Sequence, residues 1–226
     1  MTSEYLDILA SCPLFAHIDA GSLPDMLDCL AARQRHYAKG AMVLSAGRAL
    51  PAVGIVLSGG VHVLQEDYWG NRAILAHIAP GGLFGEAFAC AGVGQLPVSV
   101  QAVAPTDILL VDVQKIITVC SSACAFHTRL VQNLLQLLAQ KNVSLTQKIE
   151  IITQRSTRKK LLAYLSRQAQ AAHSHRFQIP FNRQELADYL AVDRSALSAE
   201  LSKMQQEGIL QYDKNHFQLA AAPSAS

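Results

Sequence analysis

Two short amphipathic segments separated by only three residues lie between residues 177 and 219. Asn182 can accept backbone N–H groups at the start of the first segment, 183–190, and Asp193 can do so for the second, 194–207. Each segment is too short to bury its apolar face alone. A helix, a tight turn and a second helix in this order are typical of a helix-turn-helix unit, which presents its second helix to the major groove of DNA.

The faces of these two segments differ as a DNA-reading helix pair requires. Apolar residues at three- and four-residue steps predict the buried faces, which comprise Leu186, Ala187, Leu190, Ala196, Leu197, Leu201 and Met204. The predicted outward face of the second segment comprises Arg194, Ser195, Ser198, Ala199 and Ser202. Gly208 ends the helix, and two strand-like runs, 209–212 and 216–219, predict a hairpin wing. The alternative is an ordinary helical hairpin in a core, for which the caps, turn and wing would all be coincidental.

Charge is distributed unevenly along the chain. From residue 153 onward there are ten Lys or Arg and six Asp or Glu, whereas the first 152 residues carry nine and eleven. A basic C-terminal part suits phosphate binding. The N-terminus lacks a signal-peptide pattern, and no stretch approaches roughly 18 consecutive apolar residues, so we expect a cytoplasmic protein without a membrane partner. Five cysteines form no compact disulfide framework, which fits a reducing compartment.

A long helix is predicted between residues 122 and 153, a stretch that contains neither Pro nor Gly. Residues at alternating steps of four and three form a seam that is apolar except for one Asn. The seam comprises Val131, Leu135, Leu138, Asn142, Leu145, Ile149 and Ile152. A single Asn within such a seam favours a parallel, in-register coiled coil, so we predict a homodimer. A second stripe, Leu130, Leu134 and Leu137, is expected to pack against the chain's own N-terminal domain. The alternative is one buried helix in a monomer.

A basic run, 154–160, follows the long helix and is the expected hinge. Ser156 or Thr157 can cap a new helix there. The sequence leaves two roles open for the charges of this run. They either form a solvated helix start or contact phosphate.

The N-terminal part changes to short β-rich runs between residues 39 and 113, after helical segments at 3–10 and 22–32. The predicted strands are 42–44, 53–57, 61–65, 72–78, 98–103 and 108–111. They indicate a small antiparallel barrel or jelly roll. The predicted fold is therefore α+β, with an antiparallel β-roll as effector domain, a dimerisation helix and a winged helix-turn-helix at 1–121, 122–153 and 154–226.

This order of parts resembles the Crp/Fnr superfamily of bacterial transcription regulators over nearly the full length. The motifs that carry the resemblance are Cys12-Pro13-Leu14-Phe15, the stretches 54–61 and 80–86, Arg183-Gln184-Glu185-Leu186-Ala187 and the stretch 192–198. The resemblance implies a cyclic-nucleotide-binding-like roll, double-stranded DNA as ligand, and RNA polymerase as a further partner. It places Arg183 and Gln184 near backbone phosphate.

By the same likeness, Arg194, Ser195 and Ser198 face base edges or nearby phosphate. Family members with a Glu and Arg pair on the recognition helix have it where this chain has Ser195 and Ala199. Their half-site sequence therefore does not carry over. Arg194 remains open to either a bidentate contact with guanine or a phosphate contact.

The effector pocket also departs from the cAMP-binding relatives. In those relatives a Gly-Glu pair holds the ribose and an Arg-Ser pair neutralises the cyclic phosphate. Here the first pair is present, but the second is replaced by apolar residues, which argues against cAMP because a buried phosphate would lack compensation. The apolar stretch 87–98 suits a neutral, hydrophobic or planar effector, or is packed core. The pocket candidates are Gly85, Glu86, Phe88, Cys90, Leu96 and Pro97.

Cysteines and histidines offer further sensor chemistry. Cys120 and Cys124 lie one helical turn apart and supply half a metal site or a redox switch, although buried cysteine is often filler. The iron–sulfur sensors of the superfamily have a tight N-terminal cysteine group, and this chain has only Cys12 there. Haem stays open as a cofactor, and the available axial ligand types are His17, His36, His62, His77 and Cys90.

Two other functions are weighed against an effector- or redox-responsive regulator. One is a constitutive DNA-binding protein whose roll has lost its ligand. The other is a cupin-like enzyme, which needs a His-x-His pair, whereas residues 60–66 contain a single histidine. No Ser/His/Asp set, phosphate loop or suitably spaced carboxylate pair is recognised, so we do not expect an enzyme.

Overall fold

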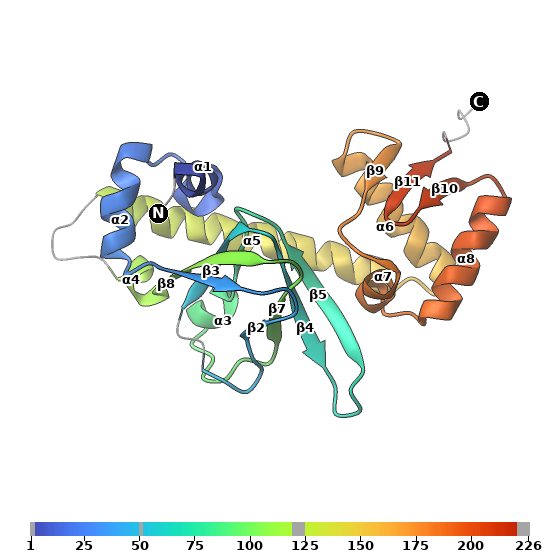
Figure 1. Ribbon diagram of the computed structural model, residues 1–226, viewed down its shortest axis with the longest axis horizontal. Coiled ribbons are helices and arrows are strands. Elements are labelled where there is room, and N and C mark those ends of the chain that lie inside the picture. The colour runs from blue at the N-terminus through green and yellow to red at the C-terminus, as the bar shows by residue number, and fades with distance from the viewer. Residues whose placement is uncertain (1–2, 50–51, 119–124, 221–226) are drawn as a thin grey trace. The chain divides into compact units, whose positions relative to one another are not determined.

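A computed structural model describes residues 3–49, 52–118 and 125–220 (Figure 1). The chain forms two compact units, Met1–Val143 and Ser144–Ser226. The long helix α5 (Ala125–Ile152) begins in the first unit and ends in the second. No helix in the described ranges combines the length and the apolar run needed to cross a membrane.

The first unit is an antiparallel β-roll, as predicted. Two four-stranded sheets have the orders β1-β8-β3-β6 and β2-β7-β4-β5. Helical segments precede, interrupt and follow the roll: α1 (Ser3–Ser11), η1 (Pro13–Phe15), η2 (Ala20–Ser22), α2 (Leu23–Cys29), α3 (Glu86–Cys90) and α4 (Val113–Ile117). The strands are β1 (Arg33–Tyr37), β2 (Met42–Leu44), β3 (Val53–Ser58), β4 (Val61–Glu66), β5 (Arg72–Ile78), β6 (Leu83–Phe84), β7 (Ser99–Ala102) and β8 (Thr106–Val111).

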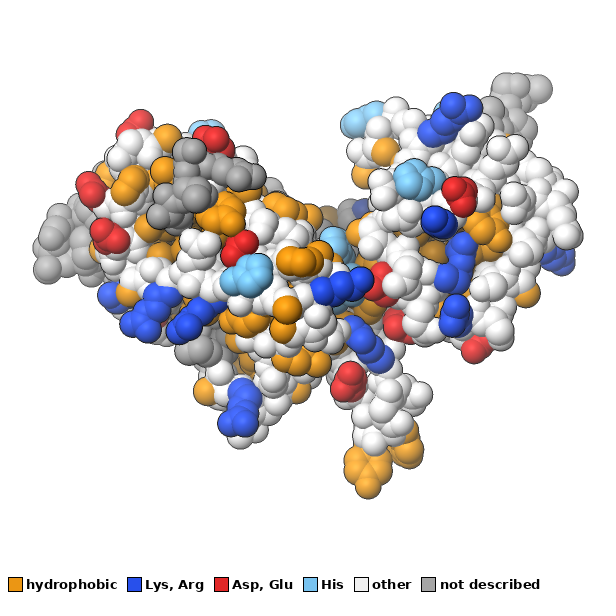
Figure 2. Space-filling model, in the orientation of Figure 1, with side chains coloured by type: hydrophobic (Ala, Val, Ile, Leu, Met, Phe, Trp, Pro, Cys, Tyr) orange, Lys and Arg blue, Asp and Glu red, His pale blue; other side chains and the backbone are white. Residues whose placement is uncertain are grey.

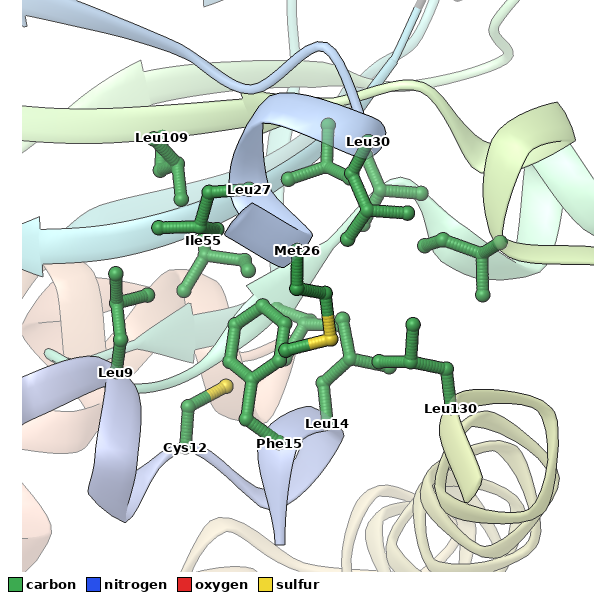
Figure 3. Packing of buried hydrophobic residues seen from close by; sticks show 14 of the residues in the cluster. Leu9, Cys12, Leu14, Phe15, Met26, Leu27, Leu30, Ile55, Leu109 and Leu130 are labelled. Carbon is green, nitrogen blue, oxygen red and sulfur yellow. The ribbon is translucent and has the colours of Figure 1, made fainter. Parts of the chain in front are cut away.

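Two apolar clusters hold this unit together. The first joins one sheet to the surrounding helices, and Figure 3 shows Leu9, Phe15 and Met26 meeting Ile55 and Leu109 of the sheet. The second comprises Val56, Val61, Phe84, Val100 and Ile108. Gly54 makes room for the second cluster, since a Cβ atom there would lie 2.0 Å from the ring of Phe84.

The hairpin between β4 and β5 projects from the roll and ends in two exposed aromatic side chains (Figures 1 and 2). Tyr68 is 95% exposed and Trp69 is 82% exposed. Asp67 fixes the turn, because its carboxylate accepts hydrogen bonds from the backbone N–H groups of Trp69 and Asn71 at 2.9 and 2.8 Å. The side-chain amide of Asn71, followed by these backbone bonds, lowers the pKa of Asp67.

The second unit surrounds the predicted helix pair with a third helix and a small sheet. Its elements after α5 are α6 (Thr157–Ala171), β9 (Arg176–Gln178), α7 (Arg183–Leu190), α8 (Arg194–Gln206), β10 (Leu210–Asp213) and β11 (His216–Leu219). The sheet order is β10-β11-β9, and Phe177 stacks on Phe217 across it. The core comprises Leu161, Leu165, Leu186, Leu190, Leu197, Leu201 and Met204.

Five details of the fold differ from the sequence predictions. β1, β6 and β9 were not predicted as strands. β1 consists of polar or half-buried residues without alternation, and it pairs along β8. α2 ends at Cys29 rather than at residue 32. Ala196 is exposed, because about 100° of helical rotation separates it from the buried Leu197.

Candidate DNA-reading surface and effector site

Side-chain caps fix both helices of the helix-turn-helix. Asn182 and Glu185 form a capping box: the Asn182 side chain accepts from the Glu185 backbone at 3.0 Å, and the Glu185 carboxylate accepts from Asn182 N–H at 2.8 Å. Ala191 ends α7 in the left-handed conformation, with φ +51°. Asp193 then starts α8 by accepting from Ala196 N–H at 2.9 Å. The short turn between the helices is therefore set by local polar contacts.

The outward face of α8 has the predicted small and polar character. Arg194, Ser195, Ala199 and Ser202 are exposed, whereas Ser198 is half-buried. The hydroxyl of Ser195 donates to the carboxylate of Asp193, and this bond is the largest cause of the lowered pKa of Asp193. Arg194 is thus the exposed cation at the start of α8, where the recognition helix of such units approaches base edges.

Arg183 and Gln184 both make contacts within the unit. The guanidinium of Arg183 lies 4.7 Å from the ring centroid of Tyr212, a cation–π contact that links α7 to the wing. Burial lowers the pKa of Arg183. Gln184 donates to the carboxylate of Asp188 at 2.8 Å. Gln184 is exposed and Arg183 is half-buried.

Two cations of the predicted hinge have structural partners. Arg158 pairs with Glu200, at 3.2 Å, in the middle of α8 and with Glu207, which directly follows the last residue of that helix. The ammonium of Lys160 donates to the carbonyl oxygens of Leu190 and Ala191 at 3.2 and 3.1 Å, where it complements the C-terminal end of α7. Of the two predicted caps, Ser156 starts α6, and Thr157 is the first residue of the helix. Arg155 and Lys159 of the same run are exposed.

The two predicted stripes of α5 have opposite environments. Leu130, Leu134 and Leu137 belong to the first core cluster, as predicted. In the seam, Val131, Leu135, Leu145 and Ile149 are 40%, 69%, 55% and 55% exposed. Asn142 is exposed too, while Leu138 and Ile152 are half-buried. A single chain therefore leaves an apolar stripe uncovered along this helix.

One pocket candidate, Glu86, forms an ion pair with a side chain of α5. Gly85, with φ +85°, precedes α3 and positions Glu86, whose side chain is 3% exposed. The carboxylate of Glu86 lies 2.6 Å from the ammonium of Lys141 on α5, which also donates to Leu83 O at 2.5 Å. Sequence reasoning missed Lys141, although it follows Leu134 by seven residues and so shares its helix face.

The remaining pocket candidates provide no charged partner. Phe88 is half-buried, Cys90 is exposed, Leu96 is buried and Pro97 is exposed. Burial and then the charge of Glu86 raise the pKa of the Cys90 thiol. Leu96 and Pro97 carry neither a cation nor a hydroxyl group.

Of the proposed axial ligands, the structure brings His62 and His77 together. They face each other on β4 and β5, with ring centroids 5.1 Å apart. Burial, followed by the charges of His77 and Arg72, lowers the pKa of His62 to about 4. His36 lies elsewhere, 3.1 Å from the carboxylate of Asp107. Within the described ranges, no three His, Cys, Asp or Glu side chains converge as a metal site; Cys120 and Cys124 lie outside these ranges.

Comparisons with known families match both units. Residues 34–123 match the cyclic nucleotide-binding domain, and residues 159–221 match the Crp-like helix-turn-helix domain. No curated protein matches the chain in sequence.

Solved structures share the fold along most of the chain. CLP of Xanthomonas campestris, a c-di-GMP-responsive global regulator, is 18% identical with a TM-score of 0.74 over 90% of this chain and 100% of that one. FixK2 from Bradyrhizobium japonicum is 20% identical, with a TM-score of 0.67 and coverages of 85% and 99%. A CooA mutant from Carboxydothermus hydrogenoformans is 21% identical, with a TM-score of 0.65 and coverages of 94% and 90%. At these identities the likeness shows the fold alone.

Proposed function

The chain belongs to the Crp/Fnr superfamily of transcription regulators, and we propose that it binds a palindromic operator as a homodimer under the control of a small effector or a redox signal. The outward face of α8 is the main observation that supports DNA binding. It presents Arg194 beside small side chains, so that the helix can approach base edges closely. RNA polymerase is the further partner expected of such a regulator.

Dimerisation is supported by the uncovered seam of α5. Leu135, Leu145 and Ile149 are each more than half exposed in a single chain, and a second copy packed in parallel would cover them. Asn142 would then face its own counterpart. The two-fold axis would place two α8 helices in successive major grooves about 34 Å apart, which matches a palindromic site.

The signal is proposed to act on the roll and not to be cAMP. Leu96 and Pro97 offer no group to neutralise a buried phosphate, and the carboxylate of Glu86 is already paired with Lys141.

A UV–visible absorption spectrum and a metal analysis of anaerobically purified protein distinguish the remaining classes of signal. A Soret band or stoichiometric iron indicates a gas or redox sensor. A colourless, metal-free protein that still selects DNA indicates an organic effector or none.

Selection of bound DNA fragments, with and without air, tests the proposed function. We expect enrichment of one palindrome and an affinity that falls steeply as salt rises, because phosphate contacts release counterions. A protein that retains no fragment under either condition at low salt contradicts the proposal.

Arg194→Ala then resolves what this side chain contacts. A guanine contact predicts relaxed selection at one base pair of each half-site, at a cost of about 1–3 kcal/mol. A phosphate contact predicts uniform weakening on all sequences and a salt slope reduced by about one. Lys203→Ala is the matched control, since Lys203 is an exposed cation in the last turn of the same helix. Wild-type behaviour of Arg194→Ala on every sequence would exclude Arg194 from the interface.

A further inference from the structure

The ion pair between Glu86 and Lys141 joins the pocket segment to α5. The ammonium of Lys141 contacts the Glu86 carboxylate at 2.6 Å and donates to Leu83 O at 2.5 Å. Leu83 lies in β6 and Glu86 begins α3, so one side chain of α5 is bound to two neighbouring elements of the roll.

Because Glu86 is buried, its charged form depends on the ion pair. Its side chain is only 3% exposed, and a buried carboxylate is costly unless a charged partner compensates it. The second carboxylate oxygen, Oε2, is buried and has no hydrogen-bond partner among the described residues. Lys141 is therefore the compensating charge that the structure shows for this carboxylate.

An ammonium at this position also restricts what can bind. A ligand that offers Glu86 a neutral hydroxyl would have to replace a charge-assisted contact, which is roughly twice as strong as a neutral hydrogen bond. It would also leave the ammonium of Lys141 without its carboxylate. The place of a ligand's donor group is thus already taken by a side chain of the same molecule.

We propose that Lys141 is a built-in ligand of the effector site. It fixes α5 to the roll, so that the protein binds DNA without an added effector, and a signal acts by breaking the pair. This inference rests on the proposed function. It also makes Lys141 the residue that determines specificity against ligands with neutral hydroxyl donors.

The position of Lys141 on α5 explains how the pair affects DNA binding. His127, Leu134 and Lys141 follow one another at seven-residue steps and all contact the roll unit: His127 bonds to Lys115 O at 3.0 Å, and Leu134 is in the core. Most of the seam lies on another face of the helix and is exposed, while Leu138 of the seam packs against the first core cluster. Holding α5 by the first face presents the seam in a fixed direction to a second copy, and DNA is read by the dimer.

Lys141→Met tests the proposal with the full-length protein and its selected DNA fragment, in the absence of any effector. We expect the affinity to fall about tenfold, a change typical of coupling between two sites. The salt slope should stay unchanged, since Lys141 contacts no phosphate. Arg129→Met is the matched control: Arg129 is exposed on the same helix, and its removal should change affinity less than about twofold.

Two further variants separate coupling from misfolding. Lys141→Arg keeps the charge and should bind nearly as the wild type does. The double variant Glu86→Gln/Lys141→Met leaves no buried charge to disrupt folding, and it should lose affinity as Lys141→Met does. Wild-type or increased affinity in both Met variants overturns the inference. A wild-type protein that selects no DNA refutes the proposed function itself, so the two failures are distinguishable.

Discussion

The two apolar stripes of α5 have similar compositions and opposite environments. Leu134 is 3% exposed, whereas its neighbour Leu135 is 69% exposed. The same contrast holds for the asparagines: Asn133 donates to Leu14 O and Ala16 O, both at 2.9 Å, whereas Asn142 is exposed. One stripe stabilises the chain itself and the other is available for assembly. Residue type alone therefore does not reveal which role an apolar or amide side chain has in a long helix.

The strongest test of this contrast is the adjacent pair Leu134 and Leu135. Leu134→Ala should lower the free energy of unfolding by about 3 kcal/mol, because it leaves a cavity in the core. Leu135→Ala should leave the unfolding of the monomer nearly unchanged and weaken dimerisation instead. Denaturant unfolding and sedimentation over a range of protein concentrations separate the two effects. Equal losses of monomer stability in both variants would contradict the assignment of the two faces.

Substitution of the two asparagines tests the same contrast, with a smaller expected change in unfolding free energy. Asn133→Ala removes the amide that donates to the backbone carbonyl oxygens of Leu14 and Ala16, so we expect a loss of about 1–2 kcal/mol in unfolding free energy. Asn142→Ala should leave monomer stability within about 0.5 kcal/mol, as is usual for exposed positions. Its effect should instead be seen in the orientation or number of chains in the assembly. Chemical denaturation and light scattering measure the two outcomes.

The features that the sequence predicted well are those set by neighbours along the chain. The bounds of α7 follow from Asn182 and Glu185, and the periodicity of α5 follows from its leucines. β1 could not be predicted, because its exposed residues form a strand through pairing with the distant β8. The contact of Glu86 with Lys141 likewise depends on how the roll packs on α5. Contacts between residues so far apart in the chain leave no local sequence pattern from which they could be predicted.

The smallest predicted effect concerns Lys148, which follows Lys141 by one heptad and contacts an aromatic ring. Its ammonium lies 4.0 Å from the ring centroid of Tyr189, and burial lowers its pKa from 10.5 to about 8. The cation–π contact favours the charged form but does not offset burial. Between about pH 8 and pH 10.5 the unfolded chain therefore binds this proton more tightly than the folded chain. The contribution of Lys148 to stability accordingly rises with pH in this window.

Lys148→Met removes this titration and makes the effect measurable as a difference. Relative to that variant, the wild type should gain about 1 kcal/mol between pH 7.5 and pH 10, a value reduced from the full linkage because Lys148 is half-buried. Burial also raises the pKa of Tyr189, and Arg167 partly opposes that shift, so the phenol stays neutral over most of the window. Lys148→Arg keeps its charge and should show no such gain. A constant difference between wild type and Lys148→Met across the window would show that Lys148 keeps its proton, and its aromatic partner would then suffice to hold the charge.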